Sequence, residues 1–394
     1  MTGSWFENNS ADVITGVVHY RSTDLYVHNT NVVLRDSGFV GNSAGSQGGV
    51  LGFYGVGGTS VQGCLLRGNH VAGYGGAIHF GGSSDESAED TYCAYNTQEF
   101  SEAFANITRT LFTNNHANSS GGAVYQSTGG DLSMTGIVME GNSAETGGGI
   151  YVGLLATTLV ISQSNLSSNK ASMDGGAIYQ DVGVVWISSV VFEQNQAGSR
   201  GGGVYAKNLT MLGSQLNANE AIHGGIGGGG LLGGPACMAS RVLSNEAGAG
   251  GGMYIIDTFS IDITDVTAVS NQALAKKGAR GGFMVVEAVK VHSQLRLMAS
   301  LIRKNLIDVD TNTAQSFMTT EFTDEKEHLG HFQSLEDCGG AAVLSSIARE
   351  QGIGPRTTGG GCTAAALLGE DPAHATGGMA RGGSAEKTID SKLA

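Results

Sequence analysis

Apolar residues along this chain recur in a unit of about 26 residues, which marks a repeat protein. In each unit an apolar residue stands three positions before an Asn, and an Ala, Val or Ile stands two positions after it. A pair of glycines usually follows, and the residue between the Asn and the Ala varies. A constrained position beside a variable one is typical of side chains that point alternately into a core and into solvent. The Asn column consists of Asn9, Asn42, Asn69, Asn115, Asn142, Asn169, Asn195, Asn219, Asn245, Asn271 and Asn305.

The spacing of the other apolar residues indicates strands. Two apolar residues stand ten and eight positions before most Asn residues, as Leu159 and Ile161 do before Asn169, and spacing by two is the period of a strand. A second strand carries the apolar residue before the Asn, and a third follows the double glycine. Three short strands cannot form a sheet alone, so each must stack on the same strand of the next turn. The pattern predicts an all-β protein, a parallel β-helix of about eleven turns.

The Asn and Gly columns have mechanical roles in such a fold. An Asn amide at a corner can donate to one turn and accept from another, which predicts a structural ladder along Asn42 to Asn271. A ligand site along the same column is the alternative. The double glycine marks a corner where φ is positive or where two backbones approach closely. The 64 glycines against 3 prolines agree with tight turns whose strands keep their N–H groups for stacking.

The combination of Phe-x-x-Asn with Gly-Gly-Ala-[Ile/Leu/Val] resembles the repeat of the polymorphic outer membrane proteins of chlamydiae. The resemblance is clearest at residues 112–115 with 121–124 and at residues 166–169 with 175–178, and it covers roughly residues 6–345. It implies a right-handed parallel β-helix of the pectin-lyase-like kind, displayed outside the cell and used in adhesion. The fold transfers from such a resemblance more readily than the function does.

The predicted domain organisation is one β-helix domain over residues 1–345. Two insertions, at about 81–109 and 306–338, break the period and should form protruding loops. Residues 346–394 lose the period and are rich in Gly and Ala, so we predict a disordered tail. The repeat begins at Phe6 without a capping element or a signal peptide, and we therefore expect a chain truncated at its N-terminus.

Charge and composition exclude several classes of partner. The chain has 21 basic and 35 acidic residues, a net charge of −14, which disfavours nucleic acid and anionic membranes. There is no run of 18 apolar residues to span a membrane. Five cysteines without metal-ligand spacing leave the compartment open, and the resemblance places the protein outside the cell or on its surface. The sequons at Asn8, Asn106, Asn118, Asn165 and Asn208 permit glycosylation if a eukaryote secretes the chain.

An aromatic column is the candidate binding surface. A Tyr follows most Gly-Gly-small-apolar runs and should face outward, where the rings stack and stabilise the ladder. The alternative is a strip for carbohydrate or for a surface protein, since Tyr combines a large contact area with a polar tip. The candidate residues are Tyr125, Tyr151, Tyr179, Tyr205 and Tyr254, with Trp186 as an outward residue expected beside Val160.

No cofactor or metal is predicted. Asp308, Asp310 and Asn312 begin like a calcium loop, but Thr313 stands where an EF-hand needs Gly and Thr319 where it needs Glu. Solvated acidic loops are the simpler interpretation of both insertions.

The leading functional hypothesis is a non-catalytic β-helix at the cell surface, an adhesin-like or display scaffold. The alternative is a carbohydrate-active enzyme of the pectin-lyase-like class, a lyase, hydrolase or epimerase. Such enzymes hold a cluster of outward charged residues on one face, and the only candidates are Asp262 and Arg296, expected as neighbours, with the 306–338 loop. Convergence of three charged groups there would favour the enzyme.

Overall fold

Strands from successive repeats lie parallel and in register in the computed structural model of the chain. Phe6 pairs with Phe39, and Phe39 with Leu66, so the apolar residue before each Asn occupies the same place in every turn. The described residues contain strands, bridges, turns and bends but no helix. The fold is all-β, a parallel β-helix, as the sequence predicts.

The structure describes most of the repeat region and only short segments beyond it. The described residues are 1–12, 15–21, 31–45, 50–54, 58–81, 104–127, 130–153, 158–180, 182–221, 231–248, 251–256, 260–273, 284–289, 294–303, 306–309, 312–322, 332–335, 341–344, 356–358 and 386–388. Most of the first insertion, nearly all of the predicted tail and Asn305 lie outside them. The number of eleven turns and the tail therefore stay predictions.

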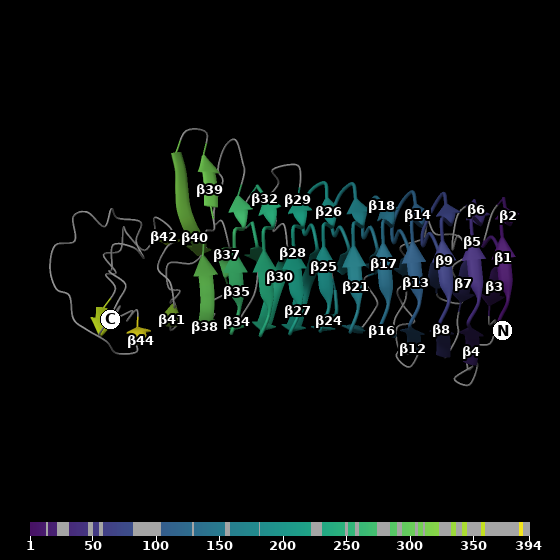
Figure 1. Ribbon diagram of the computed structural model, residues 1–394, viewed down its shortest axis with the longest axis horizontal. Helices are drawn as coiled ribbons and strands as arrows, with labels where there is room; N and C mark the ends of the chain where they lie inside the picture. Colours follow the sequence, from purple (N-terminus) through teal and green to yellow (C-terminus); the bar gives the residue numbers. More distant parts are fainter. Residues whose placement is uncertain are drawn as a thin grey trace. The chain divides into compact units, whose positions relative to one another are not determined.

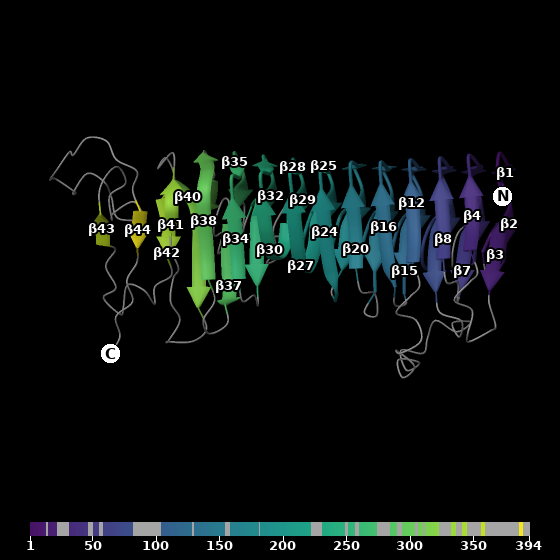
Figure 2. The same ribbon diagram turned by 90° about the horizontal axis from the view of Figure 1, so that it is seen from below.

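The chain divides into two compact units, residues 1–198 with 203–208, and residues 199–202 with 209–394. In the first unit each turn contributes four strands, which build four stacks (Figures 1 and 2). The first stack is β1 Trp5–Glu7, β5 Gly38–Val40, β9 Leu65–Arg67, β13 Leu111–Thr113, β17 Val138–Glu140, β21 Asn165–Ser167 and β25 Val191–Glu193. The second is β2 Ser10–Ala11, β6 Ser43–Ala44, β10 His70–Val71, β14 His116–Ala117, β18 Ser143–Ala144, β22 Lys170–Ala171 and β26 Gln196–Ala197.

The other two stacks of the first unit follow the second stack in chain order within each turn. The third is β3 Val18–Arg21, β7 Leu51–Tyr54, β11 Ile78–Gly81, β15 Val124–Gln126, β19 Ile150–Val152, β23 Ile178–Gln180 and the start of β27 Val204–Leu212. The fourth is β4 Asn31–Arg35, β8 Gly58–Gln62, β12 Phe104–Thr108, β16 Asp131–Thr135, β20 Thr158–Ser162 and β24 Val184–Ser188. The sequence pattern predicts three strands per turn and misses the second stack, because two residues are too few to show a period.

The second unit repeats the arrangement and then departs from it. Its strands are β28 Gln215–Asn217, β29 Glu220–Ala221, β30 Leu231–Met238, β31 Arg241–Leu243, β32 Glu246–Ala247, β33 Met253–Ile256, β34 Ser260–Thr264, β35 Thr267–Val269, β36 Gln272–Ala273, β37 Met284–Val289, β38 Gln294–Arg303, β39 Leu306–Val309, β40 Asn312–Phe322, β41 Phe332–Leu335, β42 Ala341–Leu344, β43 Arg356–Thr358 and β44 Glu386–Thr388. Strands β39 and β40 form an antiparallel hairpin, and β44 pairs antiparallel with β41 and β43.

The nine asparagines from Asn42 to Asn271 are fully buried at the corner between the first and second stacks. In the turn of Asn142, its backbone N and its Nδ2 both donate to Asn169 Oδ1, at 3.1 and 2.9 Å. The same Nδ2 donates to the carbonyl of Phe112 in the preceding turn, at 3.1 Å. Each amide therefore joins three successive turns. The residue before the Asn has positive φ, as Gly141 does at 66° and Ser168 at 55°, which turns the chain at this corner.

A second ladder lies at the corner between the fourth and first stacks, and the sequence analysis misses it. Buried Ser or Thr hydroxyls there accept from the backbone of the preceding turn, as Ser164 Oγ does from the N–H of Ile137 at 3.1 Å. Ser164 Oγ also donates to the carbonyl of Ser162 at 2.6 Å. In the sequence this second ladder is marked by a Ser, Thr or Cys five residues before the Asn. Cys64 takes this position, and burial raises the pKa of its thiol.

The double-glycine corner shows both predicted reasons for glycine. Gly121 has φ of 68°, a conformation that L side chains rarely adopt. A Cβ at Gly122 would lie 2.1 Å from the carbonyl oxygen of Gly148, so backbone of the next turn fills the space that a side chain needs.

Candidate functional site

The tyrosine column lies on the outer side of the third stack. Strand register places Tyr125 beside Tyr151 and Tyr151 beside Tyr179. Successive ring centroids from Tyr125 to Tyr205 are 5.0, 5.1 and 4.7 Å apart, and the ring planes are within 17° of parallel. In-register parallel strands repeat a side chain at nearly the thickness of a stacked ring, so the rings lie face to face.

This stacking changes what the column can bind. Each inner ring has both faces covered by its neighbours, so mainly ring edges and hydroxyls remain at the surface, not the flat faces that a sugar would stack on. The expectation that the whole column faces solvent is also wrong. Tyr205 is 5% exposed and Tyr254 is 0% exposed. Residues on both faces of their strands are buried there, whereas the strands of Tyr125, Tyr151 and Tyr179 alternate between buried and half-buried.

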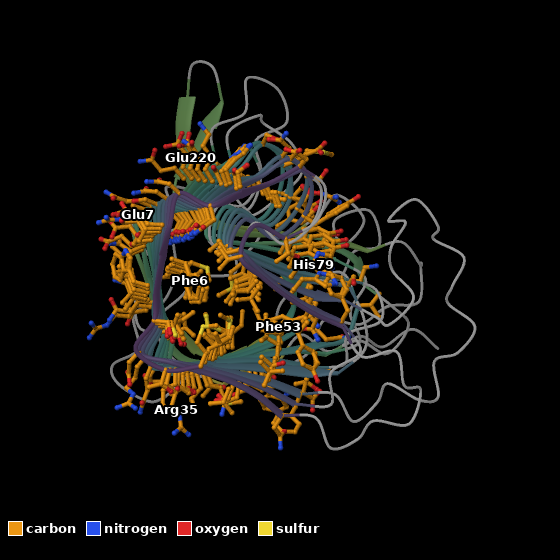
Figure 3. The ribbon with its side chains drawn as sticks, turned by 90° about the vertical axis from the view of Figure 1, so that its right-hand side faces the viewer. Phe6, Glu7, Arg35, Phe53, His79 and Glu220 are labelled. Carbon is orange, nitrogen blue, oxygen red and sulfur yellow. The ribbon has the colours of Figure 1, made fainter. Side chains whose placement is uncertain are left out.

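His79 extends the aromatic column toward the N-terminus, and the sequence analysis misses it. Its ring centroid is 4.9 Å from that of Tyr125 and 5.2 Å from that of Tyr54. Its place in the column is visible in the sequence, because His79 follows Gly-Gly-Ala-Ile where other turns have Tyr. Figure 3 shows His79 on the same side of the coil as Phe53 and away from Glu7. Neither ring nitrogen has a hydrogen-bond partner among the residues that the structure describes, and burial lowers the pKa of His79 to about 3.

A lowered histidine pKa predicts acid sensitivity. The folded protein keeps His79 neutral while the unfolded chain takes up a proton near its ordinary pKa of 6.5, so stability should fall as the pH drops from 6.5 toward 3. Between pH 7 and pH 5.5 this group should cost about 1 kcal/mol. Urea unfolding of the wild type and His79→Tyr at both pH values isolates the effect. The same pH dependence in both proteins would contradict it.

A histidine pair lies on the outer side of the second stack. The rings of His70 and His116 stack with centroids 5.0 Å apart and planes within 7°. His116 Nδ1 is 2.8 Å from Ser143 Oγ, and its Nε2 is 3.0 Å from Asn118 Oδ1. Burial and the neighbouring His116 lower the pKa of His70. Stacked imidazoles direct their lone pairs in parallel, so the pair cannot converge on one metal ion.

The fourth stack carries the other predicted neighbours. Val160 pairs in register with Trp186, as expected, and their side chains are 36% and 50% exposed. Asp262 pairs with Arg296 in the second unit, although their side chains lie outside what the structure describes. The register is therefore confirmed for both pairs, and the ion pair stays a prediction.

The predicted loops are placed only in part. Residues 104–108, at the end of the first insertion, form β12 and pair with β8 and β16. In the second insertion Asp308 pairs with Thr313 within the β39–β40 hairpin, while Asp310, Glu325, Glu327, His328 and His331 lie outside the described residues. Within the described segments no three His, Cys, Asp or Glu residues are grouped to hold a metal. No described helix is long and apolar enough to cross a membrane.

Comparison with known proteins finds the same repeat. The Chlamydia polymorphic membrane protein (Chlamydia_PMP) repeat matches residues 109–127 and 189–207. Probable outer membrane protein PmpG of Chlamydia muridarum is 29% identical over 247 residues, which cover 52% of this chain and 22% of that protein. Probable autotransporter YfaL of Escherichia coli is 24% identical over 206 residues, which cover 51% of this chain and 14% of that protein. No solved structure matches the chain.

These matches confirm the resemblance drawn from the sequence. The chain is a β-helix repeat protein of the polymorphic membrane protein type. It spans less than a quarter of the length of the two relatives that it matches.

Proposed function

We propose that this chain is a non-catalytic β-helix displayed at the cell surface, where it presents its outer faces to a carbohydrate or a surface protein in an adhesin-like role. Both relatives support the location, because one is described as a probable outer membrane protein and the other as a probable autotransporter. The relatives do not define the ligand.

One structural observation supports a scaffold over an enzyme. Apart from the tyrosine column, the repeated residues point inward, where packing requires them, and the other outward positions of the first unit differ from turn to turn. A catalytic site needs several titratable groups close enough to shift each other's pKa. The described outward columns offer pairs, such as His70 with His116 and Glu220 with Glu246, but no larger group of His, Cys, Asp and Glu residues.

Adhesion can be tested with fluorescent beads that carry the purified chain. Such beads should bind to epithelial monolayers or to bacterial cells more than beads coated with an unrelated acidic protein of similar size. Free chain added in excess should compete. Binding no greater than that of the control beads on every cell type would reject the adhesin-like role.

The enzyme alternative makes a separate prediction. We expect no turnover of polygalacturonate or alginate, with or without calcium, in assays for unsaturated products and reducing ends. Asp262 and Arg296 are adjacent in register, so they are the residues to test if activity is found. Turnover that disappears in Asp262→Asn or Arg296→Gln would establish the pectin-lyase-like function instead.

A further inference from the structure

We propose that the outer face of strands β12, β16, β20 and β24 binds a neutral, extended glycan chain. This inference rests on the proposed surface function and names its ligand and its site. It places binding on the fourth stack, around Trp186 and Phe104, rather than on the tyrosine column. Figure 2 shows these strands side by side, next to β8.

Two aromatic rings are exposed on this face. Phe104 is 54% exposed, and Trp186 is 50% exposed. The ring of Phe104 lies over Gly58 of the neighbouring strand, close enough that a Cβ at Gly58 would meet it at 2.9 Å. The absence of a side chain at Gly58 therefore leaves room for the ring at this place. Ring faces carry the negative side of the quadrupole, which attracts the polarised C–H groups of a sugar.

Polar side chains lie between the two rings. Strand register places Asn106, Ser133, Val160 and Trp186 in one outward row, with Asp131 and Thr158 in the adjacent row. The side chains of Asn106, Ser133 and Thr158 form no hydrogen bond with any described residue. Amide and hydroxyl groups both donate and accept, as sugar hydroxyls do. Val160, Trp186 and Val184 form a small apolar group at one end, but most other outward positions of this face are Ser or Thr, and serine is depleted in protein interfaces.

Charge selects a neutral glycan. The outward residues of these four strands are Phe104, Asn106, Thr108, Asp131, Ser133, Thr135, Thr158, Val160, Ser162, Val184, Trp186 and Ser188. Asp131 is the one charged residue among them, and the chain as a whole has a net charge of −14. None of these outward residues is Lys or Arg, so the face offers no cation to attract uronate or sulfate groups.

Spacing selects an extended chain. Successive strands of the stack are about 4.8 Å apart, close to the length of one pyranose residue along an extended β-linked glycan. Phe104 and Trp186 are separated by three strand spacings, or about 14 Å. A glycan that runs across the strands would therefore meet one strand per sugar and contact a ring near each end of a segment of about four sugars.

Affinity electrophoresis of the full chain tests the site directly, with hydroxyethyl cellulose as the neutral glucan and polygalacturonate as the acidic glycan. We expect retardation by the neutral glucan alone. Trp186→Ala should weaken it by on the order of tenfold, and Phe104→Ala should also weaken it. Trp5→Ala is the matched control, because Trp5 is a 60% exposed tryptophan in β1 of the first stack. Thermal unfolding checks that each variant is folded.

Fluorescence gives a second, local measurement. The chain has two tryptophans, so Trp5→Phe leaves Trp186 as the only one. Cellohexaose should shift the emission of Trp186 in that variant.

The proposal would be overturned by any of three results: no retardation of the wild type by hydroxyethyl cellulose, an equal loss of retardation in Trp5→Ala, or stronger retardation by polygalacturonate. If the beads still adhere to cells while these glycan tests fail, the surface function stands and the glycan site is wrong. If both fail, both are wrong.

Discussion

Replacing Asn169 by Leu is expected to lower the free energy of unfolding by about 1 to 3 kcal/mol. The side chain is fully buried and accepts from the backbone N and Nδ2 of Asn142, at 3.1 and 2.9 Å. Its own Nδ2 donates to the carbonyl of Met139 at 2.9 Å and to Asn195 Oδ1 at 3.0 Å. Leu has the same branched shape but cannot form hydrogen bonds, so it leaves those groups of the two neighbouring turns without partners. Urea unfolding, followed by circular dichroism, measures the loss.

Lys170→Leu is the control for this substitution. Lys170 is the next residue along the chain, lies in β22 and is exposed, so the same change to Leu removes no buried hydrogen bond. Its effect should be within about 0.5 kcal/mol. An Asn169→Leu protein as stable as the wild type would show that the ladder contributes little, and equal losses in both variants would show that the effect is not specific to the amide.

Replacing Gly122 by Ala is expected to cost about 3 kcal/mol, at the upper end of overpacking effects. The new Cβ would lie 2.1 Å from the carbonyl oxygen of Gly148 and 2.6 Å from the backbone N and O of Ser143. These are backbone atoms of a neighbouring turn, so relief requires that two turns move apart and that their hydrogen bonds lengthen. The same unfolding measurement applies.

Gly68→Ala separates steric conflict from backbone conformation. Gly68 has φ of 61° but nothing within 4 Å of its added Cβ, so Ala there should cost only about 1 kcal/mol for the left-handed conformation. Gly122 has the opposite combination, a crowded site without positive φ. If Gly68→Ala proves as destabilising as Gly122→Ala, close approach between turns is not what requires the second glycine.

Some features could be predicted from residue type and spacing alone. A residue such as Phe112 recurs in every turn because an inward position in a coil of identical turns meets the same neighbours each time. The Asn and double-glycine columns are equally visible, because each serves a corner that repeats. The hydroxyl ladder could not be predicted in the same way, because Ser164, Thr110 and Cys64 occupy one position in the turn but differ in residue type.

The candidate binding surface was predictable only in part. Trp186 and its neighbour Val160 followed from counting back from the Asn column. The exposure of Phe104 did not, since it stands at the edge of an insertion that breaks the count. Nor could the sequence show that Tyr254 is buried and that the rings of Tyr125, Tyr151 and Tyr179 cover one another, because alternation predicts which way a side chain points and not what lies above it.

The sequence by itself determined the coil: its period, its inward columns and its corners, all of which are enforced once per turn by packing and by buried backbone groups. The tertiary structure decided the surface. Which rings are exposed, and which hydroxyls form no hydrogen bond with a described residue, depend on contacts between turns about 26 residues apart. Packing does not require the same residue at an outward position in every turn. The arrangement of the outward side chains in space is therefore what distinguishes the glycan-binding face from the tyrosine column.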